Sequence, residues 1–409
     1  MMTLHSCSAY MTNFNQRVLI AGAGPVGLVA ANVLADAGIP VSVFEAETAL
    51  PQTLRASTFQ PSTLDLLSRF GVSRRLIEMG LVAPRMQYRD RKGWMAEFDF
   101  GILSDVTHHP YRVQCEQYKL NGLLAERLRK FSHANITFGA RIKAVSQDSE
   151  QVKVSFSGPG GEGSATGAWL VGADGGRSKV RDEIGVSLGG FTWPERFLVA
   201  STPFDFPAVI PDLCEVSYFA DPEQWFFLLR VSGLWRVMMP IGAEDTEADV
   251  LSDGYIQQRL HRVFDKAGDY EIIHRTIYAV HQRVANSYRN GRVFLAGDAA
   301  HLNNPLGGMG MNGGVHDAFT LADQLVAVLK GTADETTLDS YEQRRRPVAL
   351  DYVNTITIAN KRNLETRDPI EQRAWREEMT RISGDKQLAK EYLLKVSMIS
   401  SLRGAAIAA

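Results

Sequence analysis

The chain has 409 residues, of which 45% are hydrophobic and 22% are charged, and its formal net charge is −2. These proportions are ordinary for a globular protein and argue against disorder, collagen-like repeats and coiled coil. The small charge provides no basic field for nucleic acid or anionic lipid, and no apolar run reaches the ~18–20 residues of a membrane helix. The length favours two or three domains, and we expect neither a nucleic-acid nor a membrane partner.

The N-terminus and the cysteines indicate a reducing compartment. Residues 1–16 are polar and lack the apolar core of a secretory signal, so we expect a flexible leader and a cytoplasmic protein. Cys7, Cys115 and Cys214 lie far apart and form no CxxC pair, which favours buried free thiols over disulfides. No group of His, Cys and acidic residues has the spacing of metal ligands, so no metal is expected.

The first elements form a strand–helix–strand unit. Residues 17–21 are a short apolar run, a glycine cluster follows, and residues 26–37 have the composition of a helix that ends at Gly38. Residues 41–45 are a second β-rich run. Such units build parallel sheets, so an α/β fold is predicted.

Further along the chain the pattern changes twice. Residues 55–83 and 114–131 have helical patterns, and residues 136–156 have a strand pattern. Two apolar β runs, 225–231 and 235–241, joined by a short glycine-containing turn, predict an antiparallel sheet in a separate domain. A strand at 293–296, a helix to about 329 and helices over 335–409 complete the α/β pattern.

The first chemical motif is Gly22-Ala-Gly24-Pro-Val-Gly27, between the first strand and the first helix. Gly22 allows the tight turn, Gly24 lets a pyrophosphate approach the backbone, and Gly27 lets the helix pack on the sheet. The helix N-terminus offers free N–H groups to the phosphates. Glu45 ends the second strand, where a carboxylate accepts ribose hydroxyls. The motif predicts dinucleotide binding without separating FAD from NAD.

Two further glycine-rich turns follow short strands. In the first, Asp174-Gly175 comes before Arg181, and taken alone this motif is better explained as a solvated turn held by an ion pair. The second begins at Gly297-Asp298 and runs through six glycines to Gly314, before the helix that carries Asp317. Asp298 can hydrogen-bond a sugar-alcohol chain, and the helix that follows can stabilise negative charge on a flat ring.

In this order, the three motifs resemble those of the single-component FAD-dependent aromatic hydroxylases, the p-hydroxybenzoate hydroxylase-like class A flavin monooxygenases. The resemblance covers roughly residues 17–350, and residues 341–347 also look like that family's segment after the third motif. It implies an FAD-binding Rossmann-like domain of the GR2 type with an inserted antiparallel-sheet substrate domain and C-terminal helices.

The resemblance assigns the chain to regions. Residues 1–16 are the leader, and residues 17–184 and 291–350 form the FAD-binding domain, with part of 75–115 a candidate for the other domain. Residues 185–290 form the substrate-binding sheet, and 351–409 form a helical region.

The resemblance also implies an activity. NADH or NADPH reduces a non-covalently bound FAD, oxygen adds as a flavin C4a-hydroperoxide, and one oxygen atom passes to a phenolic or heteroaromatic small molecule. The expected partners are therefore a small aromatic substrate and molecular oxygen, and the protein is expected to be a monomer or homodimer. A surface groove would receive the nicotinamide cofactor, since no second GxGxxG is present.

The site residues implied by the resemblance are those at positions of this sequence that match the motifs of the family. In the family these positions contact the adenosine, the pyrophosphate, the ribityl chain or the ring. The expected FAD-binding residues are Gly22, Gly24, Gly27, Glu45, Arg55, Gln117, Asp174, Asp298, Gly310, Met311 and Asn312. Gln114 competes with Gln117 for the ribityl position, and Asp174 is implicated in nicotinamide cofactor binding as well.

The substrate is expected to meet the flavin under the 215–241 sheet. Pro305 would border the isoalloxazine ring, and Tyr218 and Arg230 are catalytic candidates on the sheet. Trp225, Phe227 and Met239 are further pocket candidates, although ordinary sheet core explains them equally well. Tyr218 and His281 are candidates for a general base.

Other functions remain open at this point. The superfamily also contains FAD-dependent epoxidases, halogenases and prenyl-chain reductases, and a non-enzymatic FAD-binding regulator is a more remote alternative. Residues 234–241, the nearest stretch to the halogenase WxWxIP segment, lack that motif.

Overall fold

The computed structural model describes residues 16–158 and 160–402. Its first layer is a six-stranded sheet with the order β18-β19-β12-β1-β2-β8, in which only the β18–β19 pair is antiparallel. The strands are β1 (Val18–Ala21), β2 (Val41–Glu45), β8 (Ala134–Phe138), β12 (Trp169–Gly172), β18 (Arg289–Asn290) and β19 (Val293–Leu295).

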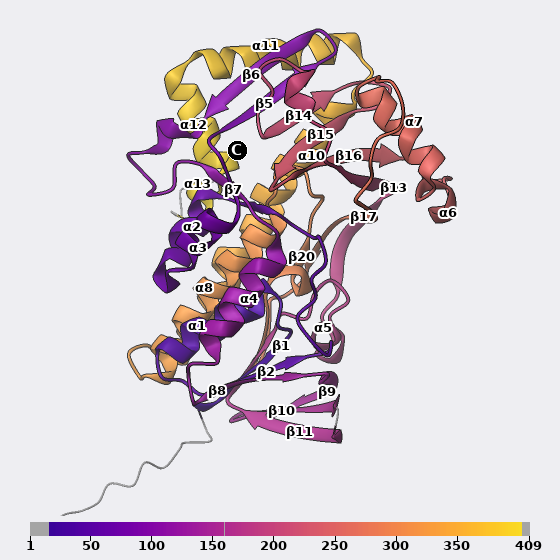
Figure 1. Cartoon of the computed structure of the whole chain (residues 1–409). Coiled ribbons are helices and arrows are strands. Elements are labelled where there is room, and N and C mark those ends of the chain that lie inside the picture. Colours follow the sequence, from indigo (N-terminus) through magenta and orange to yellow (C-terminus); the bar gives the residue numbers. More distant parts are fainter. Residues whose placement is uncertain (1–15, 159, 403–409) are drawn as a thin grey trace, which may run out of the picture.

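Helices cover one face of this sheet and a small antiparallel sheet covers the other (Figure 1). The helices are α1 (Pro25–Asp36), α4 (Gln117–Leu128) and α8 (Gly310–Leu329), and the small sheet contains β9 (Arg141–Gln147), β10 (Val152–Gly158) and β11 (Gly161–Gly167). Helix α1 is apolar all round and buried over nearly its whole length, because it packs against the sheet and against both other helices.

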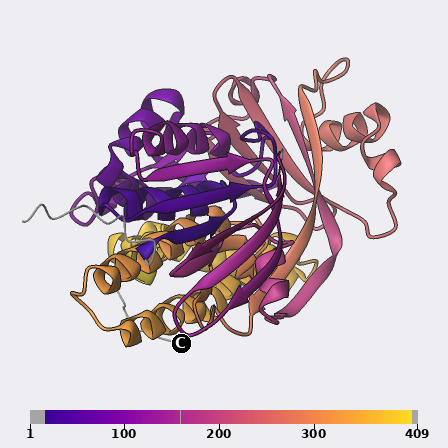
Figure 2. The same ribbon diagram turned by 90° about the horizontal axis from the view of Figure 1, so that it is seen from below.

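The second large sheet has eight strands in the order β20-β17-β13-β16-β15-β14-β5-β6, and it curves away from the first sheet (Figure 2). The strands are β5 (Arg85–Asp90), β6 (Gly93–Asp99), β13 (Leu188–Thr202), β14 (Val216–Ala220), β15 (Phe226–Val231), β16 (Leu234–Ile241), β17 (His274–Ala285) and β20 (His301–Leu302). The sheet is antiparallel apart from the parallel β14–β5 pair.

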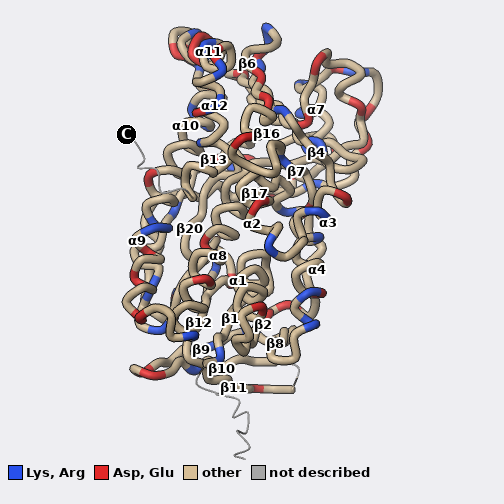
Figure 3. The backbone as a smooth tube through the Cα atoms, turned by 90° about the vertical axis from the view of Figure 1, so that its left-hand side faces the viewer, with Lys and Arg blue, Asp and Glu red and all other residues tan. Residues whose placement is uncertain are grey.

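Each face of the eight-stranded sheet has its own core. On one face an apolar cluster forms with α7 (Asp253–Val263), and on the other with the C-terminal helices α11 (Pro369–Gly384) and α12 (Lys386–Val396). Acidic and basic residues are interspersed over the described part of the chain (Figure 3). Within the described ranges no helix is long and apolar enough to span a membrane.

The other elements connect these layers. The strands β3 (Thr58–Phe59), β7 (Arg112–Gln114) and β4 (Leu81–Ala83) form a third antiparallel sheet. The remaining helices are α2 (Pro61–Leu67), α3 (Val72–Met79), α5 (Lys179–Glu183), α6 (Glu247–Val250), α9 (Asp339–Pro347), α10 (Asn354–Glu365) and α13 (Ile399–Leu402).

The structure confirms the α/β prediction and corrects two local ones. The helix predicted over 55–83 is instead β3, α2, α3 and β4, because Gly71 adopts a left-handed φ of 68° between the two helices. The sheet predicted over 185–290 also takes in β5 and β6, which come from the 75–115 segment named as a candidate for that domain, and its β14–β5 pair is parallel where an antiparallel sheet was expected. Cys115 and Cys214 are buried free thiols, as predicted, whereas Cys7 and residues 1–15 lie outside the described residues.

A buried ionic network joins the last strand of the six-stranded sheet to the helices that follow. Asp317 on α8 is fully buried, and its carboxylate accepts hydrogen bonds from Arg345 Nε at 2.6 Å and from the backbone N–H of Gly297 at 3.1 Å. His301 Nε2 lies 2.7 Å from the same carboxylate. Burial alone would raise the pKa of Asp317, but the charges of Arg345 and His301 hold this pKa well below its usual value.

Replacing Asp317 with Asn should lower the free energy of unfolding by about 3–5 kcal/mol, because Arg345 then stays buried without a counter-ion. Urea unfolding at neutral pH measures this loss. The matched control is Asp323→Asn on the same helix, whose ion pair with Arg69 is exposed and worth about 1 kcal/mol at most.

The low pKa also sets the pH window. The folded-state pKa lies below the usual value of 3.8, so the stabilisation by Asp317 is complete above about pH 4 and falls as the pH drops below it. The Asp317→Asn variant should lose this part of the acid sensitivity. Equal stability of the two α8 variants would contradict a central role for the network.

Candidate active site

All the chemical motifs meet at one edge of the six-stranded sheet. The parallel strands β1, β2, β12 and β19 end there, and each is followed by one of the residues or turns that the sequence singled out. Backbone hydrogen bonds connect the strand ends: Gly22 donates to Phe44, Ala173 to Ala21, and Ala296 to Gly172. Ligands of open α/β sheets bind outside this carboxyl edge.

The three glycines of the first motif have three different surroundings. Gly22 has a φ of 95°, and a Cβ there would lie 2.4 Å from the Ala173 carbonyl oxygen. A Cβ on Gly27 would lie 2.1 Å from the Gly22 carbonyl oxygen, so this glycine permits the helix to pack closely. A Cβ on Gly24 would meet no protein atom within 4 Å. The free space at Gly24, beside the α1 N-terminus, fits a pyrophosphate.

Glu45 lies beside this loop. Its Oε2 accepts a hydrogen bond from the backbone N–H of Ala23 at 2.7 Å, and its Oε1 accepts one from Glu47 at 2.9 Å. These bonds fix the carboxylate at the strand end, half-buried, and each oxygen keeps a second lone pair for a ribose hydroxyl.

Asp298 follows β19 on the same edge. Burial raises the pKa of its carboxyl group, and the charges of His301 and Arg55 oppose this shift. The side chain is nevertheless exposed to solvent. The two observations agree because the carboxylate lies deep in the fold but faces open space, as expected of a residue that binds the sugar-alcohol chain of a cofactor. Arg55 is exposed and close enough for its charge to act on Asp298.

Two expected ligand residues are instead engaged with the protein. Asp174 accepts hydrogen bonds from Ser178 Oγ at 2.5 Å and from the Val180 N–H at 3.1 Å, so its two oxygens order the turn before α5. Asn312 donates to the carbonyl oxygens of Thr58 and Gly308 and accepts from the Gln60 N–H. In this arrangement both position loops, and direct contacts with FAD stay predictions.

The competing glutamines lie apart. Gln117 begins α4 half-buried, and its backbone N–H donates to the Ala56 carbonyl oxygen beside Arg55. Gln114 is buried on β7 and accepts from Thr58 Oγ1 at 2.8 Å, while its amide nitrogen has no partner within the described ranges. The arrangement does not choose between them.

The glycine-rich loop after Asp298 connects the strand edge to the second sheet. Gly307 and Gly308 have φ values of 109° and 66°, and the loop ends at Gly310, the first residue of α8. The first N–H groups of α8 have no partner within the helix. Leu306, next to the half-buried Pro305, belongs to the same apolar cluster as Tyr218. The loop therefore lies between the dinucleotide edge and the aromatic face of the sheet.

Tyr218 and Arg230 lie on opposite faces of the eight-stranded sheet. Tyr218 is buried and stacks on Tyr88 and Phe227, with ring centroids 5.2 and 5.1 Å apart. Arg230 is exposed, and its guanidinium lies 5.7 Å from the Trp235 ring on the other face. Strand alternation turns Arg230 away from Tyr218, and the catalytic roles of both residues stay predictions. Met239 lies on the same face as Arg230, and its role also stays a prediction.

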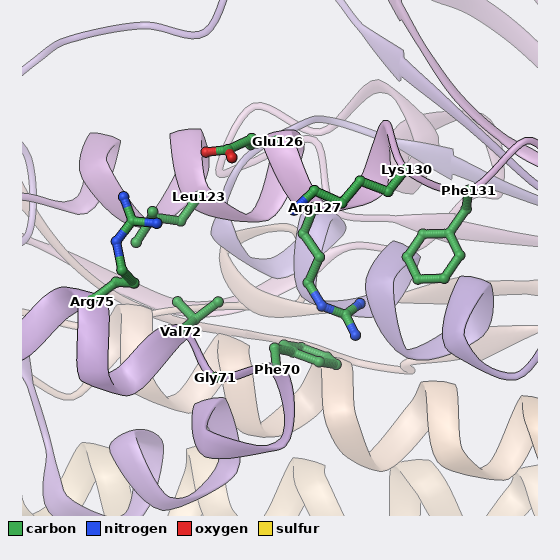
Figure 4. A pocket seen from close by; sticks show the side chains of 9 residues that line it. All are labelled: Phe70, Gly71, Val72, Arg75, Leu123, Glu126, Arg127, Lys130 and Phe131. Atoms are coloured by element: carbon green, nitrogen blue, oxygen red, sulfur yellow. The ribbon is translucent and has the colours of Figure 1, made fainter.

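A surface pocket lies away from these motifs, between α3 and α4 (Figure 4). Arg127 lies over the rings of Phe70 and Phe131 there and pairs with Asp36. No residue predicted for the active site lines this pocket, so it is not the site that the motifs define.

Sequence reasoning missed several residues that hold the site together. The pairing of Asp317 with Arg345 was not predicted, although both positions had been noted, because no local pattern reports a contact across 28 residues. Arg181 was noted only as a neighbour of the second motif, yet its guanidinium donates to the Ala299 and Gly176 carbonyl oxygens and so ties the second turn to the third.

This arrangement of a dinucleotide edge, a glycine-rich loop and an aromatic sheet face defines a flavin-dependent monooxygenase of class A. The model of the family described as "FAD binding domain" matches residues 15–355. The chain belongs to this family.

Relatives of known activity match most of the chain. It is 35% identical to the para-nitrophenol 4-monooxygenase of Pseudomonas sp. (strain WBC-3), over 94% of this chain and 96% of the relative. It is 32% identical to 6-hydroxy-3-succinoylpyridine 3-monooxygenase HspB of Pseudomonas putida (strain DSM 28022 / S16), over 87% and 91%. The structure of p-nitrophenol 4-monooxygenase PnpA from Pseudomonas putida DLL-E4 superimposes with a TM-score of 0.89 at 32% identity, over 95% and 98%.

These findings confirm the predicted class. The protein is an FAD-dependent aromatic monooxygenase that uses NAD(P)H as reductant. All three named relatives are monooxygenases whose names give aromatic substrates, which favours aromatic hydroxylation over the epoxidase, halogenase, reductase and regulator alternatives.

The two glycines near the pyrophosphate give a matched test. Gly24→Ala adds a methyl group into free space at a φ of −71°, which alanine adopts readily, so the unfolding temperature of the FAD-free protein should not change. FAD affinity should fall roughly 5- to 150-fold, because the methyl group occupies space that the ligand needs. Gly27→Ala should instead lower the unfolding temperature itself. The reverse pattern, with Gly24→Ala destabilised and FAD affinity intact, would argue against this site.

Glu45→Ala removes a charged acceptor for ribose hydroxyls. FAD affinity, measured by quenching of flavin fluorescence, should fall about 10- to 150-fold while the fold persists. The exposed neighbour Glu47 provides the control, and Glu47→Ala should bind FAD normally. Unchanged affinity in Glu45→Ala would mean that the ribose lies elsewhere.

Proposed function

We propose that this chain hydroxylates a small monocyclic phenol and that p-nitrophenol is the first substrate to test. The para-nitrophenol 4-monooxygenase aligns with this chain over nearly the full length of both proteins, which supports the assignment. The observation that carries most weight within the protein is the aromatic face beside the glycine-rich loop. There Tyr88, Tyr218 and Phe227 form one stack, suited to a flat ring of similar size.

The residues of the chain have separate tasks in this proposal. Bound FAD supplies hydride acceptance from NAD(P)H and the activation of oxygen. Asp298 fixes the position of the cofactor through its sugar-alcohol chain, and Pro305 borders the ring. Tyr218 and its stack orient the phenol, and the buried faces around it exclude water. The N-terminus of α8 offers N–H groups to negative charge at the ring.

The overall reaction balances with the known co-substrates. At a ring carbon bearing hydrogen, the phenol, oxygen, NAD(P)H and a proton give the hydroxylated phenol, water and NAD(P)⁺. At the carbon bearing a nitro group, the new C–O bond replaces the C–N bond. p-Nitrophenol, oxygen and NAD(P)H then give benzoquinone, nitrite, water and NAD(P)⁺.

The proposal is tested by measuring NAD(P)H oxidation with p-nitrophenol, 4-hydroxybenzoate, phenol and 6-hydroxynicotinate. We expect p-nitrophenol to accelerate oxidation most and to release one nitrite for each NAD(P)H in a coupled reaction. NADH and NADPH are compared in the same assay. If another compound accelerates oxidation and yields a product 16 mass units heavier, the class stands and the proposed substrate is wrong.

We also propose a localisation and an oligomeric state. We infer a cytoplasmic protein, which the buried free thiols of Cys115 and Cys214 support. A monomer or homodimer is proposed from the family resemblance, and light scattering on the purified protein decides between these two states.

Asp298→Ala should affect coupling more than folding. The carboxylate sets where the flavin ring lies relative to Pro305, and misplacing the ring by about 1 Å can cost ~10²-fold in rate. FAD should be retained at high concentration, while NAD(P)H oxidation yields more hydrogen peroxide and less product. Peroxide and product are measured together per NAD(P)H consumed, with Asp323→Asn as control. Full coupling at the wild-type rate would show that Asp298 does not position the ring.

A further inference from the structure

Arg112 is a buried cation between the glycine-rich loop and the aromatic face. It begins β7 and is only 1% exposed. Its Nε donates to Gln60 Oε1 at 3.0 Å, and Gln60 Nε2 donates in turn to the Gly307 carbonyl oxygen at 2.9 Å. A single glutamine therefore connects this guanidinium to the loop that borders the flavin.

Among the described residues, only Nε of this guanidinium has a hydrogen-bond acceptor. In residues 16–158 and 160–402 no carboxylate forms an ion pair with Arg112, and neither terminal nitrogen has a hydrogen-bond partner. The two terminal nitrogens are not fully enclosed. The small surface that Arg112 exposes therefore lies at these nitrogens. The guanidinium lies over the Phe100 ring, 5.0 Å from its centroid.

Each of the other buried arginines has at least one terminal guanidinium nitrogen hydrogen-bonded to the protein. Arg345 pairs with Asp317, Arg181 donates to two carbonyl oxygens, and Arg236 donates to the carbonyl oxygens of Leu54 and Arg55. A buried charge without a counter-ion destabilises a fold. Arg112 therefore has the properties of a residue whose counter-ion arrives with a ligand.

Two phenolic hydroxyls lie close enough to Arg112 for its charge to act on them. Tyr88 Oη and Tyr392 Oη lie 2.9 Å apart, and Tyr88 stacks on Tyr218. Burial raises the pKa of both tyrosines, and the positive charge of Arg112 acts on both in the opposite direction. The guanidinium is thus close to the end of the aromatic stack where the polar substituent of a bound phenol would lie.

We propose that Arg112 selects acidic phenols by pairing its guanidinium with the negatively charged oxygen of the bound substrate anion. This assignment rests on the proposed function, since it places the phenol between the stack and the loop. An arginine beside an anionic oxygen forms charge-assisted hydrogen bonds, and it favours the ionised form of the ligand. An ionised phenol is the more electron-rich ring, so the same contact that gives specificity prepares the ring to accept oxygen.

The test is the ionisation of p-nitrophenol bound to the FAD-loaded enzyme without reductant, followed by the absorbance of the nitrophenolate. Wild-type enzyme should lower the pKa of the bound ligand by about 1–3 units relative to free ligand. Arg112→Met should abolish this shift and weaken p-nitrophenol binding roughly 10- to 150-fold. Arg112→Lys should restore part of the shift. 4-Nitroanisole, which cannot ionise, should bind the wild type and Arg112→Met equally.

Arg89→Met is the matched control. Arg89 is a buried arginine next to Tyr88 in the chain, but its guanidinium lies near the Phe219 ring and donates to Gln87 and to the Asp212 carbonyl oxygen. This variant should leave the pKa of the bound ligand unchanged. Arg112→Met should keep its FAD and unfold at the same temperature as the wild type or higher, because an unpaired buried charge is removed.

The outcomes separate the two proposals. A wild-type pKa shift that survives in Arg112→Met, or an equal loss of 4-nitroanisole binding, would overturn the role of Arg112. Loss of FAD from Arg112→Met would assign the cation to the cofactor and overturn it as well. If wild type neither binds nor oxidises p-nitrophenol, the proposed substrate fails, and the same comparison is made with whichever phenol accelerates NAD(P)H oxidation.

Discussion

The carboxyl edge of the six-stranded sheet is the constraint on which the rest of the structure depends. Because β1, β2, β12 and β19 are parallel neighbours, their ends meet, and residues from four distant parts of the sequence become one site. The close approach of α1 to this edge requires Gly27, where any side chain would collide with the Gly22 carbonyl oxygen. A dinucleotide therefore finds a helix N-terminus, an acidic strand end and free space at Gly24 together.

The segment after β19 connects this strand edge to the second sheet. Strand β20 pairs with β17, through Arg283 with Leu302 and Val284 with His301, so the turn that bears Asp298 is bound to both sheets. The buried carboxylate of Asp317 holds the start of that turn through the Gly297 N–H, and Arg345 balances its charge. Cofactor position and substrate face are consequently fixed by the same short stretch of chain, which explains why coupling should depend on Asp298.

The sequence was informative where the cause is local. Glycine spacing, helix periodicity and strand alternation predicted the first βαβ unit, and α4 buries Leu120, Leu124 and Leu128 as its pattern indicated. These features depend on backbone conformation and on neighbours a few residues away. The family motifs then predicted cofactor and reaction class, since their order is specific to this kind of flavoprotein.

Features that depend on distant contacts were not predictable in the same way. Nothing in the local sequence distinguishes Asn312 as a residue that ties the loop to Thr58, nor Arg112 as a buried cation without a counter-ion. Strand alternation places Arg230 on the opposite face from Tyr218, but only the packed structure shows that its guanidinium lies near the Trp235 ring. Partners of buried polar groups come from other elements, and only the packed structure identifies them.

The central claim, that this strand edge binds one FAD, is tested most directly by titrating FAD-free protein with FAD by calorimetry and then denaturing the complex. We predict one FAD per chain, a yellow complex, and complete release of free FAD on denaturation. Absence of binding, a different stoichiometry, or flavin that stays attached to the denatured chain would contradict the account.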